Sequence, residues 1–160
     1  MLDTAVDTAV VPGSFDPITT GHLDLIERTA RIFSRVIVTL SPNAEKKYMF
    51  EANDRINAVR AAVAHMPNVE AVILHGLLAD FAAEQNAVLV KGARGAVDFD
   101  YEKNLFDINN ALSGVDTLIL PASKEVQFVS STFVRELIRY GKPLDSYVPK
   151  EAIPFLVRGV

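Results

Sequence analysis

The 160-residue chain contains no cysteine and only three histidines. Without cysteine it can form no disulfide bond and offers no thiolate to a metal ion. Three histidines scattered along the chain are also too few for a histidine-rich metal site. No apolar run approaches the roughly 20 residues that a membrane-spanning helix needs. These absences argue against a disulfide framework, a Cys/His metal centre and a transmembrane protein.

Basic residues are scarce as well. The first ten residues, MLDTAVDTAV, have two aspartates and no lysine or arginine, which is not the pattern of a secretory signal peptide. The whole chain carries a net charge of −4 with 49% apolar residues, so it has the composition of a folded protein without the basic excess that nonspecific nucleic-acid binding requires. Its length fits one domain, 1–160. We expect a single-domain cytoplasmic protein that contacts neither membrane nor nucleic acid.

Familiar motifs of catalytic and nucleotide-binding sites are also missing. No G-x-G-x-x-G follows the first predicted strand, which argues against a nicotinamide-dependent dehydrogenase. No G-x-x-x-x-G-K-[ST] occurs, so the usual phosphate loop is absent. The G-x-S-x-G elbow of serine hydrolases is absent too. A nucleotide site in this chain must therefore be built in another way.

Short apolar runs alternate with helical patterns along the chain. The predicted strands are 9–11, 35–40, 69–74, 87–92 and 116–121. The predicted helices are 22–33, 51–66, 77–85, 100–112, 130–141 and, in the tail, 150–159. Pro154 is expected to interrupt the tail helix near its start. The alternation predicts an α/β fold, a five-stranded parallel sheet with helices on both faces.

The segments that follow the predicted strands share features that bind phosphate. Their cationic residues are His22, Lys46, Lys47, Lys91, Arg94 and Lys124. His22 and the run 130–132 lie at helix N-termini, where free N–H groups and the helix dipole favour an anion. Each feature alone has an ordinary explanation, because SST before a helix is usually a cap and paired lysines in a loop are usually solvated. Ligands of parallel sheets bind beyond the carboxyl ends of the strands. Because the cationic residues and the two helix N-termini all fall at that edge, together they predict a polyphosphate site.

Several motifs resemble those of a known enzyme superfamily. TTGH (19–22) resembles the [T/H]-x-G-H signature of the nucleotidyltransferases, and SSTFVRE (130–136) resembles their second motif. The blocks PGSFDPITTGHLDLIERT, KKYMF, ADFA, VKGARGAVDFDYE and PASKEVQFVSSTFVRE resemble, in order and spacing, bacterial phosphopantetheine adenylyltransferases over nearly the whole chain. The resemblance implies a Rossmann-like dinucleotide-binding fold. It also implies a reaction of coenzyme A biosynthesis, in which ATP and 4′-phosphopantetheine give dephospho-coenzyme A and pyrophosphate.

The same resemblance implies roles for individual residues. His22 matches the residue that contacts ATP phosphate and stabilises the transition state. Ser14 stands where the family usually has threonine and holds phosphates of both substrates. Lys46, for which Lys47 is an alternative, matches the lysine that binds substrate phosphate. The positions that match the phosphopantetheine site are Ser14, Lys46, Leu78 and Lys91. Those that match the ATP site are Ser14, Phe15, His22, Gly92, Ala93, Arg94, Glu102, Val126, Gln127, Phe128, Val129, Ser130, Ser131 and Thr132.

This reaction needs no general base, because the second pKa of a phosphate monoester is about 6 and the group is largely ionised at pH 7. We therefore expect direct in-line attack on the α-phosphate of ATP without a covalent enzyme intermediate. Mg²⁺ is implied by the use of ATP, and it is expected to be carried on the phosphates because no compact carboxylate cluster is evident. The resemblance also implies a homo-oligomer, a hexamer.

Three positions depart from the family pattern without loss of chemistry: Ser14 for threonine, Ala93 for leucine and Thr132 for serine. The segment 103–110 matches more loosely, which leaves fine specificity open. Two other functions also stay open. One is an adenylyltransferase for another phosphate such as nicotinamide mononucleotide, although the block KGARGAVDFDYE favours phosphopantetheine. The other is a non-catalytic nucleotide-binding module, against which the intact cationic residues argue.

Overall fold

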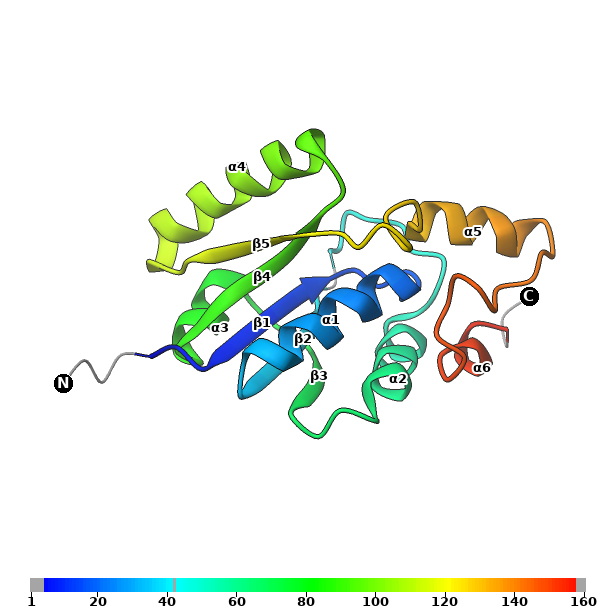
Figure 1. The fold of residues 1–160 in the computed structure, drawn as a ribbon, viewed down its shortest axis with the longest axis horizontal. Coiled ribbons are helices and arrows are strands. Elements are labelled where there is room, and N and C mark those ends of the chain that lie inside the picture. The colour runs from blue at the N-terminus through cyan, green and yellow to red at the C-terminus, as the bar shows by residue number, and fades with distance from the viewer. Residues whose placement is uncertain (1–4, 42, 158–160) are drawn as a thin grey trace.

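The computed structural model describes residues 5–41 and 43–157, which form one five-stranded sheet with surrounding helices (Figure 1). The strands are β1 (Thr8–Gly13), β2 (Arg35–Leu40), β3 (Val69–Ile73), β4 (Ala87–Ala93) and β5 (Thr117–Pro121). Their order is β3-β2-β1-β4-β5, and every pair is parallel. The predicted α/β class with a five-stranded parallel sheet is therefore confirmed.

Six helices lie within the described residues. They are α1 (Thr20–Ile32), α2 (Ala52–Val63), α3 (Leu78–Glu84), α4 (Ala96–Ser113), α5 (Ser131–Arg139) and α6 (Ile153–Leu156). None of them is long and apolar enough to cross a bilayer. The start of the chain (1–4) and the end of the predicted tail helix (158–159) lie outside the described residues.

Two predictions about the helices were wrong, and most other predicted boundaries differ from the observed ones by one to three residues. The helix α4 begins at Ala96 and not at residue 100, because Gly95 supplies an extended N-cap while the apolar periodicity used for the prediction marks only the second half of the helix. Pro154 does not interrupt α6 but lies in its first turn. Proline is tolerated there, because its missing N–H would have no partner within the helix in any case.

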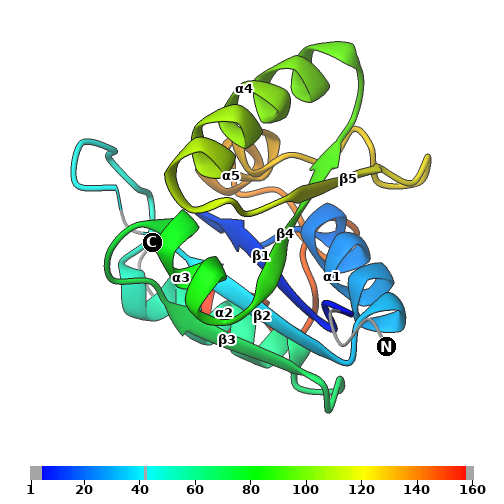
Figure 2. The ribbon, with the colours of Figure 1, turned by 90° about the vertical axis from the view of Figure 1, so that its left-hand side faces the viewer.

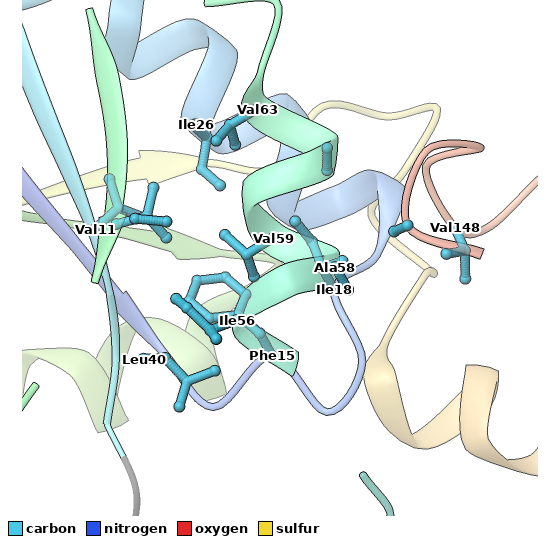
Figure 3. Packing of buried hydrophobic residues seen from close by; sticks show 14 of the residues in the cluster. Val11, Phe15, Ile18, Ile26, Leu40, Ile56, Ala58, Val59, Val63 and Val148 are labelled. Carbon is cyan, nitrogen blue, oxygen red and sulfur yellow. The ribbon is translucent and has the colours of Figure 1, made fainter. Parts of the chain in front are cut away.

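Both faces of the central strands β1 and β2 are largely buried, as their near-continuous apolar runs predict. Ala9 and Val11 of β1 belong to the larger core cluster with α1 and α2, whereas Val10 between them belongs to a second cluster with Ala82 of α3. Figure 3 shows the larger cluster, in which Val11 lies near side chains of α1 and α2. In Figure 2, α1 and α3 lie on opposite sides of the twisted sheet.

The strand order determines where a ligand can bind at the carboxyl ends of the strands. The chain fills the sheet from β1 outward to β3 and then returns to the other side of β1 with β4. β1 pairs with β2 along its full length, whereas with β4 it pairs only from Thr8 to Val10. The loops after β1 and β4 therefore leave the sheet in different directions. Ligands of open α/β sheets bind in the crevice that such a change of direction opens.

Candidate active site

A cavity of about 690 Å³ lies at the carboxyl edge of the sheet. This volume is in the range of small-molecule sites. Of the predicted residues, the cavity wall includes Ser14, Phe15, His22, Lys46, Lys91, Gly92, Arg94, Glu102, Val126, Val129, Ser130, Ser131 and Thr132. The wall does not include Leu78, Ala93, Gln127 or Phe128. Leu78 instead lines a hollow of about 30 Å³ that it shares with Lys91 and Glu102.

The loop after β1 holds an aromatic ring beneath the cavity. Phe15 is 2% exposed and has a φ of 46°, a left-handed backbone conformation that is strained for a bulky residue. A Cβ atom at Gly13 would lie 2.8 Å from Cζ of Phe15, so any larger residue there would have to displace the buried ring. The ring of Phe15 packs edge-on against His22 with 5.1 Å between the ring centroids. The loop thus restrains the imidazole from one side.

The cap of α1 fixes the tautomer of His22. Thr19 is the N-cap, and its Oγ1 accepts a hydrogen bond from the backbone N–H of His22 (3.3 Å). In return, the backbone N–H of Thr19 donates to Nδ1 of His22 (3.0 Å). Because a backbone N–H can only donate, Nδ1 carries no proton, and the proton of the neutral imidazole is on Nε2. His22 therefore presents an N–H donor and has no free basic nitrogen.

The surroundings of His22 also keep it uncharged. Burial is the largest cause that lowers its pKa, and the positive charges of Lys91 and Arg94 lower it further, to about 4. Free histidine has a pKa near 6.5. In an unfolded chain the imidazole of His22 therefore becomes protonated as the pH falls below about 6.5, whereas in the folded protein it becomes protonated only near pH 4. Between these values His22 destabilises the fold progressively as the pH decreases.

We expect His22 of the ligand-free protein to remain in the neutral Nε2–H form throughout the range from about pH 5.5 to 8. Long-range ¹H–¹⁵N NMR spectra distinguish the two tautomers and the imidazolium ion. N-acetylhistidine in the same buffer provides the reference titration. A His22 midpoint close to that of the reference, or a proton on Nδ1, would contradict this assignment.

Two cations at the end of β4 are held by acidic residues of α4. Nζ of Lys91 lies 3.4 Å from Oε2 of Glu102, and both side chains are largely buried. The contact lacks the geometry of a hydrogen bond, and the buried Oε2 accepts no hydrogen bond from any of the described residues. Arg94 donates from its backbone N–H and from Nε to Oδ2 of Asp98, each at 3.0 Å. The backbone bond is the main cause of the lowered pKa of Asp98.

The three hydroxyls at the start of α5 have different partners. Ser130 is the N-cap, and its Oγ accepts from the backbone N–H of Phe133 (3.1 Å). Ser131 donates to the carbonyl oxygen of Pro17 (2.9 Å), and Thr132 accepts from Arg135 (3.1 Å). Since all three also line the cavity, the motif combines a helix cap, Ser130, with two further hydroxyls in the cavity wall.

Sequence reasoning missed a contact that holds the segment between β5 and α5. Oδ2 of Asp24 accepts from the hydroxyl of Ser123 (2.8 Å), and Arg28 donates to the carbonyl oxygen of Pro121 (2.7 Å). Asp24 and Arg28 both line the cavity. In the sequence they form only an i,i+4 pair, which is typical of an exposed helix face. No signal in the sequence indicates that the end of β5 packs against this pair.

Comparisons with known proteins place the chain in a family. A family model described as "Cytidylyltransferase-like" matches residues 10–137. The chain is 42% identical over 144 residues to a protein named "Phosphopantetheine adenylyltransferase" from Psychromonas ingrahamii, which covers 89% of each chain. It is 44% identical over 145 residues to the protein of that name from Pasteurella multocida, covering 89% of this chain and 92% of the relative.

A solved structure is similar in fold. It is a bifunctional NMN adenylyltransferase/ADP ribose pyrophosphatase from Francisella tularensis, with a TM-score of 0.65 and 15% sequence identity. The match covers 91% of this chain and 45% of the other. At this identity the likeness concerns the fold alone. By its family match and its curated relatives, the chain belongs to the cytidylyltransferase-like family and, within it, to the phosphopantetheine adenylyltransferases.

Proposed function

We propose that this chain transfers the adenylyl group of ATP to 4′-phosphopantetheine, which gives dephospho-coenzyme A and pyrophosphate in coenzyme A biosynthesis. The main support is that relatives of this name are 39–44% identical over nearly their whole length. The cavity adds chemical support, because His22, Lys91 and Arg94 line it together with the N-terminus of α5. These are donors and cations suited to two polyanions.

The reaction follows from the charges of its participants. An oxygen of the acceptor phosphate attacks the α-phosphorus of ATP, a new P–O bond forms, and the bond to pyrophosphate breaks. The attacking oxygen is already ionised, so the chain has to supply only position and charge stabilisation. His22 donates from Nε2 to an α-phosphate oxygen, and it cannot act as a base because Nδ1 already accepts from Thr19. No covalent enzyme intermediate forms.

The remaining residues divide between the two substrates. Lys91 and Lys46, with Lys47 as the alternative to the latter, hold the acceptor phosphate, and Leu78 contacts the pantetheine arm. Arg94 and the N-terminus of α5 hold the triphosphate. Leu78 lies in the small hollow beyond the Lys91–Glu102 pair, so an acceptor bound to Lys91 has an apolar side chain within reach.

Mg²⁺ belongs to the substrate in this proposal. Within residues 5–41 and 43–157, no group of three or more histidine, aspartate or glutamate side chains could hold a metal ion. Mg²⁺ prefers phosphate oxygens and water and often needs only one or two carboxylates. We therefore propose that ATP enters as its Mg²⁺ complex. A cytoplasmic location, where ATP is abundant, fits this substrate and is testable by cell fractionation.

The decisive experiment measures pyrophosphate release from Mg²⁺–ATP with three additions: 4′-phosphopantetheine, nicotinamide mononucleotide and buffer alone. We expect release with 4′-phosphopantetheine only. Release with nicotinamide mononucleotide instead would assign the chain to the alternative acceptor. Binding of ATP without release for any acceptor would leave a non-catalytic nucleotide-binding module.

The hydroxyls of α5 give a further prediction. Ser131→Ala combined with Thr132→Ala should raise the KM for ATP, because both hydroxyls lie in the cavity at a helix N-terminus. The melting temperature should fall by only a few degrees, since neither residue is the cap. Ser130→Ala is the matched control, for which we expect a loss of about 0.5–2 kcal/mol in unfolding free energy. An unchanged KM with a large drop in melting temperature would reduce the pair to a structural role.

The outer side of α4 supports self-association. No residue of the 18-residue α4 is fully buried, and Ile108 and Leu112, one helical turn apart, are 56% and 58% exposed. Exposed apolar side chains on one side of a helix are typical of an interaction site. We propose that a second copy covers this face, and the family resemblance predicts a hexamer. Light scattering should show the oligomer, and Ile108→Glu should dissociate it.

A further inference from the structure

Arg55, in the first turn of α2, is a buried cation without an acidic partner. It is 2% exposed, and none of the ion pairs among the described residues includes it. Burial of an unpaired charge is unfavourable, and so is a cation at the positive end of a helix. The contacts of the guanidinium must therefore offset this cost.

Those contacts join two loops of the cavity. Nη1 of Arg55 donates to the carbonyl oxygen of Ser14 (2.7 Å), in the loop after β1. Nε donates to the carbonyl oxygen of Phe50 (3.0 Å), and the guanidinium stacks 3.8 Å above the ring centroid of Tyr48, both in the segment after β2. Ser14 and Tyr48 line the cavity, whereas Arg55 does not. Arg55 thus acts on the cavity only through these neighbours.

Asp16 makes a second connection between the same loops. It is 5% exposed, and its two carboxylate oxygens accept from the backbone N–H groups of Met49 (2.9 Å) and Phe50 (3.0 Å). Its own carbonyl oxygen accepts from Arg135 of α5 (2.8 Å). A buried carboxylate with two backbone donors is a strong restraint. The end of the segment after β2 is therefore fixed relative to the loop after β1.

The restrained segment is the one that carries the paired lysines. Lys46 and Lys47 immediately precede Tyr48 and line the cavity. Oη of Tyr48 accepts from the backbone N–H of Asn43 (2.9 Å), and the backbone N–H of Lys46 donates to the carbonyl oxygen of Asn43 (3.0 Å). These bonds close residues 43–48 into a compact turn whose far end is held by Arg55.

We propose that Arg55, assisted by Asp16, is a positioning residue. It sets the spacing between Ser14 and the turn 43–48, which carries Lys46 and Lys47, so that a phosphate monoester is held between Ser14 and these lysines. The inference rests on the proposed function, in which this monoester is the acceptor. The unpaired charge of Arg55 also makes the site more favourable for a dianion. Lysine at this place keeps the charge but loses the planar fork and the stacking contact.

Arg55→Lys should therefore raise the KM for 4′-phosphopantetheine by about tenfold, as expected when a hydrogen bond from a charged group is lost. The rise in the KM for ATP should be smaller, because Arg94 and α5 do not depend on Arg55. Arg60→Lys is the matched control: its Nε donates to the carbonyl oxygen of Ala71 (3.1 Å) from the same helix, outside the cavity wall. Equal rises for both substrates would overturn the proposal.

Hydrogen exchange of the Met49 and Phe50 amides tests the restraint without any substrate. Exchange at these amides should accelerate in Arg55→Lys and stay unchanged in Arg60→Lys, and unaltered exchange in both would also overturn the proposal. If Arg55→Lys does not fold, Asp16→Asn decides in the same way, because it replaces one of the two carboxylate oxygens that accept from the Met49 and Phe50 N–H groups with an amide NH₂. A wild-type protein that releases no pyrophosphate with 4′-phosphopantetheine would refute the proposed function, while the exchange result would still decide whether Arg55 fixes the turn.

Discussion

His22→Ala is expected to lower kcat by about 10²–10³-fold, the usual effect of removing one donor from developing charge. The KM for ATP should change much less, because in the proposed function Arg94 and the N-terminus of α5 hold the triphosphate independently of His22. The structure gives this expectation a specific chemical basis. Thr19 occupies Nδ1 and the pKa is lowered to about 4, so His22 is a neutral donor before substrate arrives.

His22→Gln is the informative control. Its side-chain amide carries N–H donors but no titratable group, so it should retain more turnover than alanine if donation is the role of His22. Melting temperatures must accompany both variants, because the ring of His22 also packs against Phe15. Near-normal turnover in His22→Ala would refute the assignment, and equal losses in both variants would argue against donation.

The sheet and the order of its elements could be predicted because they depend on local patterns. Five short apolar runs separated by helical periodicities leave few arrangements other than a parallel sheet with crossover helices. β2 was predicted with its exact bounds, since Arg35–Leu40 is a compact β-branched run between a helix and a turn. The start of α4 was not, because its first turn depends on a glycine cap and on exposed residues.

Within the candidate site, the residues at strand ends and helix starts could be predicted, whereas the residues that hold them could not. Arg55 lies in the predicted helix 51–66, where no local pattern indicates that it is buried. The contacts of Asp16 and Asp24 join segments 33 and 99 positions apart in the chain. Such long-range partners are determined by the packing of the whole sheet edge, and no local pattern records them.

Lys91→Ala should raise the KM for 4′-phosphopantetheine by about 10–100-fold, more than the KM for ATP, because a charge-assisted contact to the acceptor phosphate is lost. The acidic neighbour of Lys91 gives a reason to expect a second contribution to this loss. Lys91 lies 3.4 Å from the buried Oε2 of Glu102. Without the ammonium, the carboxylate of Glu102 would face the acceptor phosphate and repel it.

Two further variants separate these effects. Lys91→Arg keeps the charge and should stay close to wild type, whereas Lys91→Ala with Glu102→Gln removes the repulsion and should recover part of the affinity for the acceptor. In the neighbouring turn, Lys46→Ala should affect the KM for 4′-phosphopantetheine more than Lys47→Ala, since Lys46 matches the family's lysine. If Lys91→Ala raised only the KM for ATP, the division of the cations between the two substrates would be wrong. If the double variant were no better than Lys91→Ala, Glu102 would have no electrostatic role, and the whole loss would be that of the contact between Lys91 and the phosphate.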